Sequence, residues 1–130
     1  NWENLPVIDQ SSDGATVQAD RFAALESLAA RYGGTVLLKG LGTLVRGDGG
    51  TALISDGNPG MATGGMGDVL TGVIAALHAQ GLPGYQAAAL GAMAHARAAD
   101  RAAAADGERG LLATDLLAAL RPVLNGDDER

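Results

Sequence analysis

The sequence contains no cysteine among its 130 residues, so disulfide bonds and thiolate metal sites are excluded. This absence fits a reducing compartment, and we predict a cytoplasmic location. No apolar run approaches the length that crosses a bilayer, and no signal peptide is visible. We therefore predict a soluble chain with no membrane partner.

Positive charge is also scarce, because nine Lys and Arg residues stand against fifteen Asp and Glu residues, for a formal net charge of −6. Nucleic-acid binding needs clustered basic side chains that replace phosphate counterions, so we predict no nucleic-acid partner. Neither His78 nor His95 has a second ligand-type residue at helical spacing, so we predict no histidine-built metal site. The 47% hydrophobic content is enough for one packed domain or part of one.

The first third of the chain is predicted to contain one helix and one strand. Residues 1–20 are rich in turn-forming types and are predicted to be loop, with a short strand or turn at residues 5–8. Apolar residues at helical spacing predict a helix over residues 18–32, with Arg21, Glu26 and Arg31 on its solvent face. The residues predicted to form its buried face are Phe22, Leu25, Leu28 and Ala29.

Three short strands are predicted, at residues 35–38, 44–46 and 51–55. The first is continuously apolar, which favours a central strand covered on both faces. Three helices are predicted to follow. They cover residues 68–80, 84–106 and 114–124, and the second has a solvent face marked by Arg97, Asp100 and Arg101.

Glycines crowd residues 57–67, directly before an apolar helix. Such an approach lets several backbone N–H groups turn toward one point at a helix N-terminus, where the helix dipole favours negative charge. Asp68 follows at the mouth of this site. A carboxylate so close to a bound phosphate is unfavourable unless it serves the reaction, so Asp68 is a candidate base for a substrate hydroxyl.

Lys39 follows the strand at residues 35–38, at the end where ligands bind in open α/β sheets. Simpler interpretations are available for each candidate: Asp68 as a helix cap, Lys39 as a solvated strand-end lysine, and Thr43 as a turn residue. The glycine loop is not a Walker A motif, and Leu70 occupies the third small position of a dinucleotide fingerprint. The residues alone therefore leave the phosphate chemistry open.

Four segments, in order, resemble the carboxyl-terminal half of the NAD(P)H-hydrate dehydratases, a ribokinase-like family. They are Lys39-Gly-Leu-Gly-Thr43, the run Gly57-Asn-Pro-Gly-Met-Ala-Thr-Gly-Gly-Met-Gly-Asp68, His95-Ala-Arg-Ala-Ala-Asp100 and Arg109-Gly-Leu-Leu-Ala-Thr-Asp-Leu-Leu117. The glycine-rich run is highly specific, and the later segments are weaker support. The resemblance implies an α/β fold, the carboxyl-terminal part of a three-layer α/β/α sandwich. We therefore expect residues 1–130 to be a partial domain whose first half is absent.

The resemblance also implies an activity, that of a hydro-lyase that repairs hydrated NADH or NADPH with ADP or ATP and Mg²⁺. Asp68 matches the residue that contacts the hydrated nicotinamide and is the expected catalytic residue. Family members often carry a small hydroxyl residue where Met66 stands, so backbone donation is kept here while a hydroxyl contact is lost. The positions that match the nucleotide and phosphate sites are Lys39, Gly40, Leu41, Gly42, Thr43, Gly64, Gly65, Met66 and Gly67.

Two other functions use the same residues. One is a ribokinase-like kinase for a small vitamin precursor or sugar, with the same loop and the same aspartate. The other is a non-catalytic nucleotide-binding module, in which Asp68 only caps a helix. In each case we expect a homo-oligomer, because apolar surface left exposed by the missing half would favour self-association.

Overall fold

The computed structural model describes residues 14–126, and the strand or turn predicted at residues 5–8 lies outside this range. Five α-helices, three strands and one short 3-10 helix follow each other along the described chain. They are α1 (Gly14–Ala19), α2 (Arg21–Tyr32), β1 (Val36–Leu38), β2 (Thr43–Gly47), β3 (Gly50–Ile54), η2 (Pro59–Met61), α3 (Met66–Ala79), α4 (Gly84–Asp106) and α5 (Asp115–Leu124).

The three strands form an antiparallel sheet in the order β1-β2-β3. Gly47 pairs with Gly50, so Asp48 and Gly49 form a two-residue hairpin turn between β2 and β3. The prediction of a central position for residues 35–38 is wrong for the described chain, because β1 lies at an edge of this sheet. The predicted cover on both faces of this strand is confirmed, since Val36 and Leu38 pack toward α2 and Leu37 packs toward α3 and α4.

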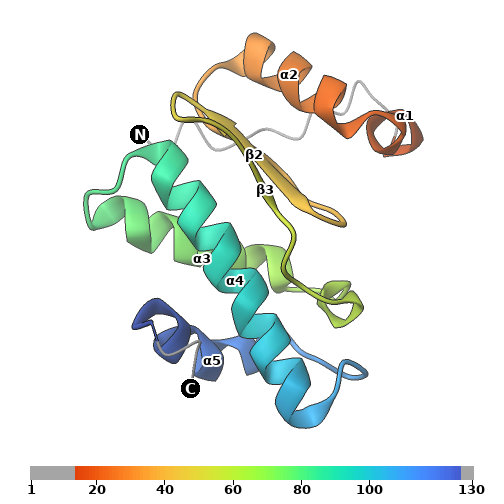
Figure 1. Ribbon diagram of the computed structural model, residues 1–130, viewed down its shortest axis with the longest axis vertical. Coiled ribbons are helices and arrows are strands. Elements are labelled where there is room, and N and C mark those ends of the chain that lie inside the picture. Colours follow the sequence, from red (N-terminus) through yellow and green to blue (C-terminus); the bar gives the residue numbers. More distant parts are fainter. Residues whose placement is uncertain (1–13, 127–130) are drawn as a thin grey trace.

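Side chains alternate between two helical layers along the strands, as the pleat of a sheet requires. On one face Val36 and Leu44 pack with Leu25 of α2. On the opposite face Val45 packs with Leu70 of α3 and with alanines of α4. Figure 1 shows the sheet between α2 on one side and the α3 and α4 pair on the other. This arrangement of helix, sheet and helix confirms the predicted α/β class and its three layers.

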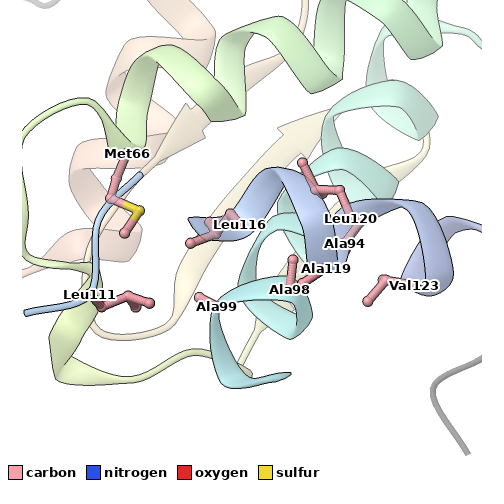
Figure 2. Packing of buried hydrophobic residues seen from close by; sticks show 9 residues of the cluster. All are labelled: Met66, Ala94, Ala98, Ala99, Leu111, Leu116, Ala119, Leu120 and Val123. Carbon is pink, nitrogen blue, oxygen red and sulfur yellow. The ribbon is translucent and has the colours of Figure 1, made fainter. Parts of the chain in front are cut away.

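A second core lies beyond the sheet, where α3, α4 and α5 meet (Figure 2). Leu116 is fully buried there, beside the thioether of Met66 at the start of α3. The α4 residues in this core are all alanines, so the helices approach closely with little side chain between them. The members of the cluster are Met66, Ala94, Ala98, Ala99, Leu111, Leu116, Ala119, Leu120 and Val123.

Gly91 sets the distance between α3 and α4. A Cβ atom at this position would lie 2.7 Å from Ile74 Cγ1 and 3.4 Å from Ile74 Cα, so only a residue without a side chain fits. We expect Gly91→Ala to lower the free energy of unfolding by about 1 kcal/mol, because overpacking outweighs the gain in helix propensity. Urea unfolding measures this change. Gly72→Ala, on the same helix pair but with open space at its Cβ position, is the matched control and should not destabilise.

The N-terminal part of the described chain differs from the prediction in three ways. Residues 14–19 are helical rather than loop, and α2 begins at Arg21 because Asp20 caps it, with Oδ1 accepting from the Ala23 N–H at 2.9 Å. Phe22, predicted to be buried, is 58% exposed. Arg21, predicted to face solvent, is half-buried against the end of β1. None of the helices within residues 14–126 is long and apolar enough to cross a membrane.

Candidate functional site

The site is built around the first turn of α3. Its N-cap is Gly65, which adopts a left-handed backbone conformation with φ of 87° and supplies no side-chain cap. The first helical hydrogen bond runs from the Val69 N–H to the Gly65 carbonyl at 3.1 Å. The N–H groups of Met66, Gly67 and Asp68 therefore precede the helical pattern, and no cap side chain competes for them. This geometry suits an anion, because the donors converge where the helix dipole is positive.

Asp68 is the third residue of α3 and not the first, because the helix begins two residues earlier than predicted. Its side chain is exposed in the first turn. The interpretation of Asp68 as the helix cap is wrong, since Gly65 holds that position. The carboxylate is therefore available at the surface beside the glycine turn.

Lys39 reaches this turn from the end of β1. Its Nζ lies 3.3 Å from the point where a Cβ atom of Gly67 would stand, so the absence of a side chain at Gly67 leaves room for the ammonium. The antiparallel register places Leu38 opposite Leu44 and Thr43 opposite Ile54, so the turn at residues 39–42 and the exit from β3 share one end of the sheet. The structure thus brings Lys39 and the glycine loop together, whereas Leu41 is 99% exposed at the tip of the turn.

Arg21 shapes the turn at residues 39–42, a role that the sequence did not reveal. Its Nη1 donates to the Leu41 carbonyl at 2.6 Å and its Nη2 donates to the Leu38 carbonyl at 3.1 Å. Gly40 lies so close to the guanidinium that a Cβ atom there would be 2.8 Å from Nη2. No local pattern indicates this contact, because α2 and the turn are separate in sequence.

Asp100 of α4 anchors the loop that leads to α3. Its Oδ2 accepts from the Gly57 N–H at 2.9 Å, and its Oδ1 accepts from Asn58 Nδ2 at 2.8 Å. Asn58 Oδ1 in turn accepts from the Gly60 N–H at 3.0 Å. The prediction that Asp100 only marks a solvent face is wrong, because its carboxylate is half-buried and paired with the loop. The sequence separation of more than forty residues explains why local patterns missed it.

His95 of α4 lies next to the first turn of α3, near Met66, and is 3% exposed. Burial, followed by the positive charge of Lys39, lowers the pKa of His95 below its usual 6.5, while a backbone hydrogen bond to Met66 acts in the opposite direction. The imidazole is therefore mainly neutral at pH 7. His78, the second histidine, is exposed, and its Nδ1 lies 2.8 Å from the Leu82 carbonyl oxygen.

The lowered pKa of His95 predicts a pH dependence of stability. The unfolded chain binds this proton more readily than the folded protein does, so stability is retained above about pH 6.5 and falls as the pH drops toward the lowered pKa. We expect His95→Gln to reduce the slope of unfolding free energy against pH in this window, by at most about 1.4 kcal/mol per pH unit. Urea unfolding from pH 7.5 to pH 5 measures it, with His78→Gln as the control. Equal slopes for wild type and His95→Gln would contradict the prediction.

A cavity lies elsewhere in the described part of the chain. It has a volume of about 530 Å³ between the end of α4 and α5, and none of the predicted site residues lines it. We therefore base the candidate site on the uncapped amides and Lys39, and not on this cavity. Within residues 14–126 no three His, Cys, Asp or Glu side chains come close enough together to hold a metal ion.

Fold and geometry place the chain among the α/β proteins in which a glycine-rich turn leads into a helix N-terminus, an arrangement that suits phosphate groups. The particular family is shown by comparison. The family model for NAD(P)H-hydrate dehydratase matches residues 6–122, and the chain belongs to this family.

Relatives and solved structures agree with this assignment. The chain is 57% identical over 109 residues to the bifunctional NAD(P)H-hydrate repair enzyme Nnr of Vibrio cholerae, covering 84% of this chain and 22% of the relative. It is 45% identical over 113 residues to the ADP-dependent (S)-NAD(P)H-hydrate dehydratase of Neisseria meningitidis, covering 85% of this chain and 38% of the relative.

The structure of the ADP/ATP-dependent NAD(P)H-hydrate dehydratase of Bacillus subtilis, co-crystallised with ATP and Mg²⁺ and soaked with CoA, superposes with a TM-score of 0.77 at 28% identity. This match covers 85% of this chain and 41% of that chain. The chain thus spans less than half the length of the relatives it matches. The similarity confirms the predicted fold class as the fold of this family.

Proposed function

We propose that the protein acts in the repair of hydrated NADH and NADPH, as an ADP- or ATP-dependent dehydratase. One observation carries the proposal: the uncapped amides at the start of α3 lie beside the Lys39 ammonium, which comes close because Gly67 has no side chain. Membership of the family and the names of the relatives support the reaction. Hydroxide is a poor leaving group and phosphate a good one, so a phosphate site is what such a dehydration requires.

The described residues fit a nucleotide with its metal ion. Because Gly67 has no side chain, the Lys39 ammonium lies close to the first-turn amides, where both can bind the same phosphate group. Mg²⁺ would be held mainly by the phosphate oxygens of the nucleotide, since no three His, Cys, Asp or Glu side chains within residues 14–126 come close enough together to hold a metal ion. When bound, the nucleotide supplies the phosphoryl group and Mg²⁺ shields its charge.

Each part of the site has one proposed role. Lys39 and the turn Gly40, Leu41, Gly42 and Thr43 hold the nucleotide. The amides from Gly64 to Gly67, through Met66, bind the phosphate that is transferred, since oriented donors stabilise developing charge. Asp68 contacts the hydrated nicotinamide and takes up the proton of its hydroxyl group. Loss of phosphate together with a proton from the neighbouring ring carbon then restores the ring double bond.

We also propose that residues 1–130 form the carboxyl-terminal part of a dehydratase domain. The support is the coverage of 38% of the Neisseria meningitidis relative, in which the rest of the domain comes from other residues.

Self-association is a further prediction, supported by exposed apolar side chains on α5 such as Leu117 at 57%. A cytoplasmic location likewise stays a prediction, based on the absence of cysteine.

The test is an assay that offers hydrated NADH, ADP or ATP and Mg²⁺ to the complete domain that carries these residues. We expect the absorbance of NADH to return in a nucleotide-dependent manner. A ribokinase-like kinase would instead consume nucleotide with a sugar or vitamin precursor and leave the hydrate unchanged. A binding module would bind ADP with no turnover of either kind, and these two results would each overturn the proposal.

A further inference from the structure

Among the residues whose burial the structure describes, His95 is the only buried residue with a polar or charged side chain. It projects from α4 among alanines, 3% exposed, in a helix whose other buried positions are apolar or glycine. A buried imidazole needs hydrogen-bond partners for its two nitrogens, because water cannot reach them. The proposed dehydratase mechanism does not yet use this residue.

Three elements meet around the His95 ring. The ring is hydrogen-bonded to the backbone of Met66 in α3, and the charge of Lys39 after β1 acts on it. Lys39 Nζ in turn lies 3.3 Å from the Cβ position of Gly67, the next residue of α3. His95 therefore lies at the base of the turn whose amides form the candidate phosphate site.

The two nitrogens of His95 differ in their surroundings. Nε2 is fully buried and has no hydrogen-bond partner, so Nδ1 makes the bond to Met66. That bond favours the protonated ring, as expected when a ring N–H donates to a carbonyl oxygen. A neutral imidazole that donates through Nδ1 carries its lone pair on Nε2. The buried Nε2 is thus an acceptor that lacks a donor.

Lys39 is suited to supply that donor. Its ammonium has three N–H groups and no acceptor, on a stem with four rotatable bonds. The side chain is exposed and its end already lies against the first turn of α3. A rotation of the lysine side chain toward His95 would offer one N–H group to Nε2 and leave two for phosphate oxygens.

We propose that His95 is a positioning residue for the phosphate site: it bonds the Met66 carbonyl through Nδ1 and accepts a hydrogen bond from the Lys39 ammonium through Nε2. The ammonium is thereby held against the amides of Met66 and Gly67. The inference rests on the proposed nucleotide binding, but the state of the ring can be measured without any nucleotide.

The first experiment is nitrogen-15 NMR of the histidine rings in the 130-residue chain at pH 7. We expect His95 in the Nδ1–H tautomer, with Nε2 carrying the lone pair. The spectrum of His78→Gln assigns the remaining ring signals to His95, because the chain has only these two histidines. An Nε2–H tautomer or an imidazolium ring at His95 would overturn the proposal, because neither can accept from an ammonium through Nε2.

The second experiment is a double-mutant cycle on ADP affinity, measured by calorimetry. His95→Asn keeps a donor for Met66 and removes the Nε2 acceptor, and we expect it to weaken ADP binding about 10-fold. In a Lys39→Met background, His95→Asn should lower ADP affinity by less than about 2-fold, because the ammonium that His95 positions is absent. His95→Gln places an amide oxygen near the former Nε2 and should retain affinity within about 3-fold. His78→Gln is the matched control and should bind like wild type.

The outcomes separate this inference from the function on which it rests. Failure of the wild-type chain to bind ADP would count against the proposed nucleotide site. The NMR experiment would still test the Nδ1–H tautomer of His95, because it needs no nucleotide. If wild type binds ADP and His95→Asn costs the same with or without Lys39, His95 does not act through the lysine and the inference is wrong.

Discussion

Asp68→Asn is expected to lower the turnover of hydrated NADH by about 10² to 10⁴-fold in the complete domain, because an amide cannot take up the proton of the substrate hydroxyl. The side chain is exposed in the first turn of α3, so the substitution leaves no cavity and creates no buried unpaired group. Nucleotide affinity should be unchanged or slightly tighter, since the phosphate is held by amides and loses a neighbouring negative charge. Stability should change by less than about 1 kcal/mol, the usual effect of one charge at a helix N-terminus.

The measurement pairs steady-state turnover with ADP titration on the same preparation. Asp48→Asn is the matched control, because Asp48 is an exposed acid in the hairpin turn, where asparagine followed by glycine is equally suitable. Near-normal turnover in Asp68→Asn would remove this residue from the chemistry. Loss of ADP binding in the same variant would assign it to the nucleotide site instead.

Asp100→Asn is expected to lower the free energy of unfolding by about 2 kcal/mol, because two donors then compete for a single acceptor oxygen. The Gly57 N–H and Asn58 Nδ2 each donate to a separate oxygen of this carboxylate, and one of them would face the new amide N–H₂. The loop has little room to move toward the segment that follows α4, since a Cβ atom at Gly60 would already lie 2.6 Å from the Glu108 carbonyl oxygen. ADP binding should weaken about 10-fold, because the same loop leads to the amides of α3.

Urea unfolding and ADP calorimetry measure the two effects. Asp106→Asn, an exposed acid in the last turn of the same helix, removes the same charge without touching the loop and should leave both quantities within error. Wild-type stability and affinity in Asp100→Asn would show that the two hydrogen bonds do not determine the loop conformation.

Much of the fold could be predicted because its signals are local. The helix at residues 84–106 has the bounds that were expected, since Pro83 and Gly107 flank an alanine-rich segment with strong helix propensity. The hairpin of β2 and β3 follows from its glycine-rich turn. The helix over residues 14–19 was missed because six residues of mixed type are too few to show a helical repeat of apolar side chains.

The parts of the site that the sequence did not reveal depend on contacts across elements. Arg21 and Asp100 both have the charge pattern of surface residues on amphipathic helices, yet each bonds the backbone of a functional loop. The sequence predicted only that His95 is not part of a histidine-built metal site, and the packing of α4 places it in the interior beside Met66. The edge position of β1 was likewise hidden, because a covered edge strand and a central strand have the same apolar pattern.

The sequence by itself determined the presence of the glycine turn before an apolar helix, the order of the main helices and strands from residue 21 onward, and the membership of a family. These properties follow from the conformational freedom of glycine and from the spacing of apolar residues, which can both be recognised within a few neighbouring residues. Only the tertiary structure decided that Lys39 faces Gly67, that Asp100 holds the loop, and that His95 lies neutral beneath them. Those relations arise from packing between distant segments, and the burial and charge of a side chain are properties of that packing.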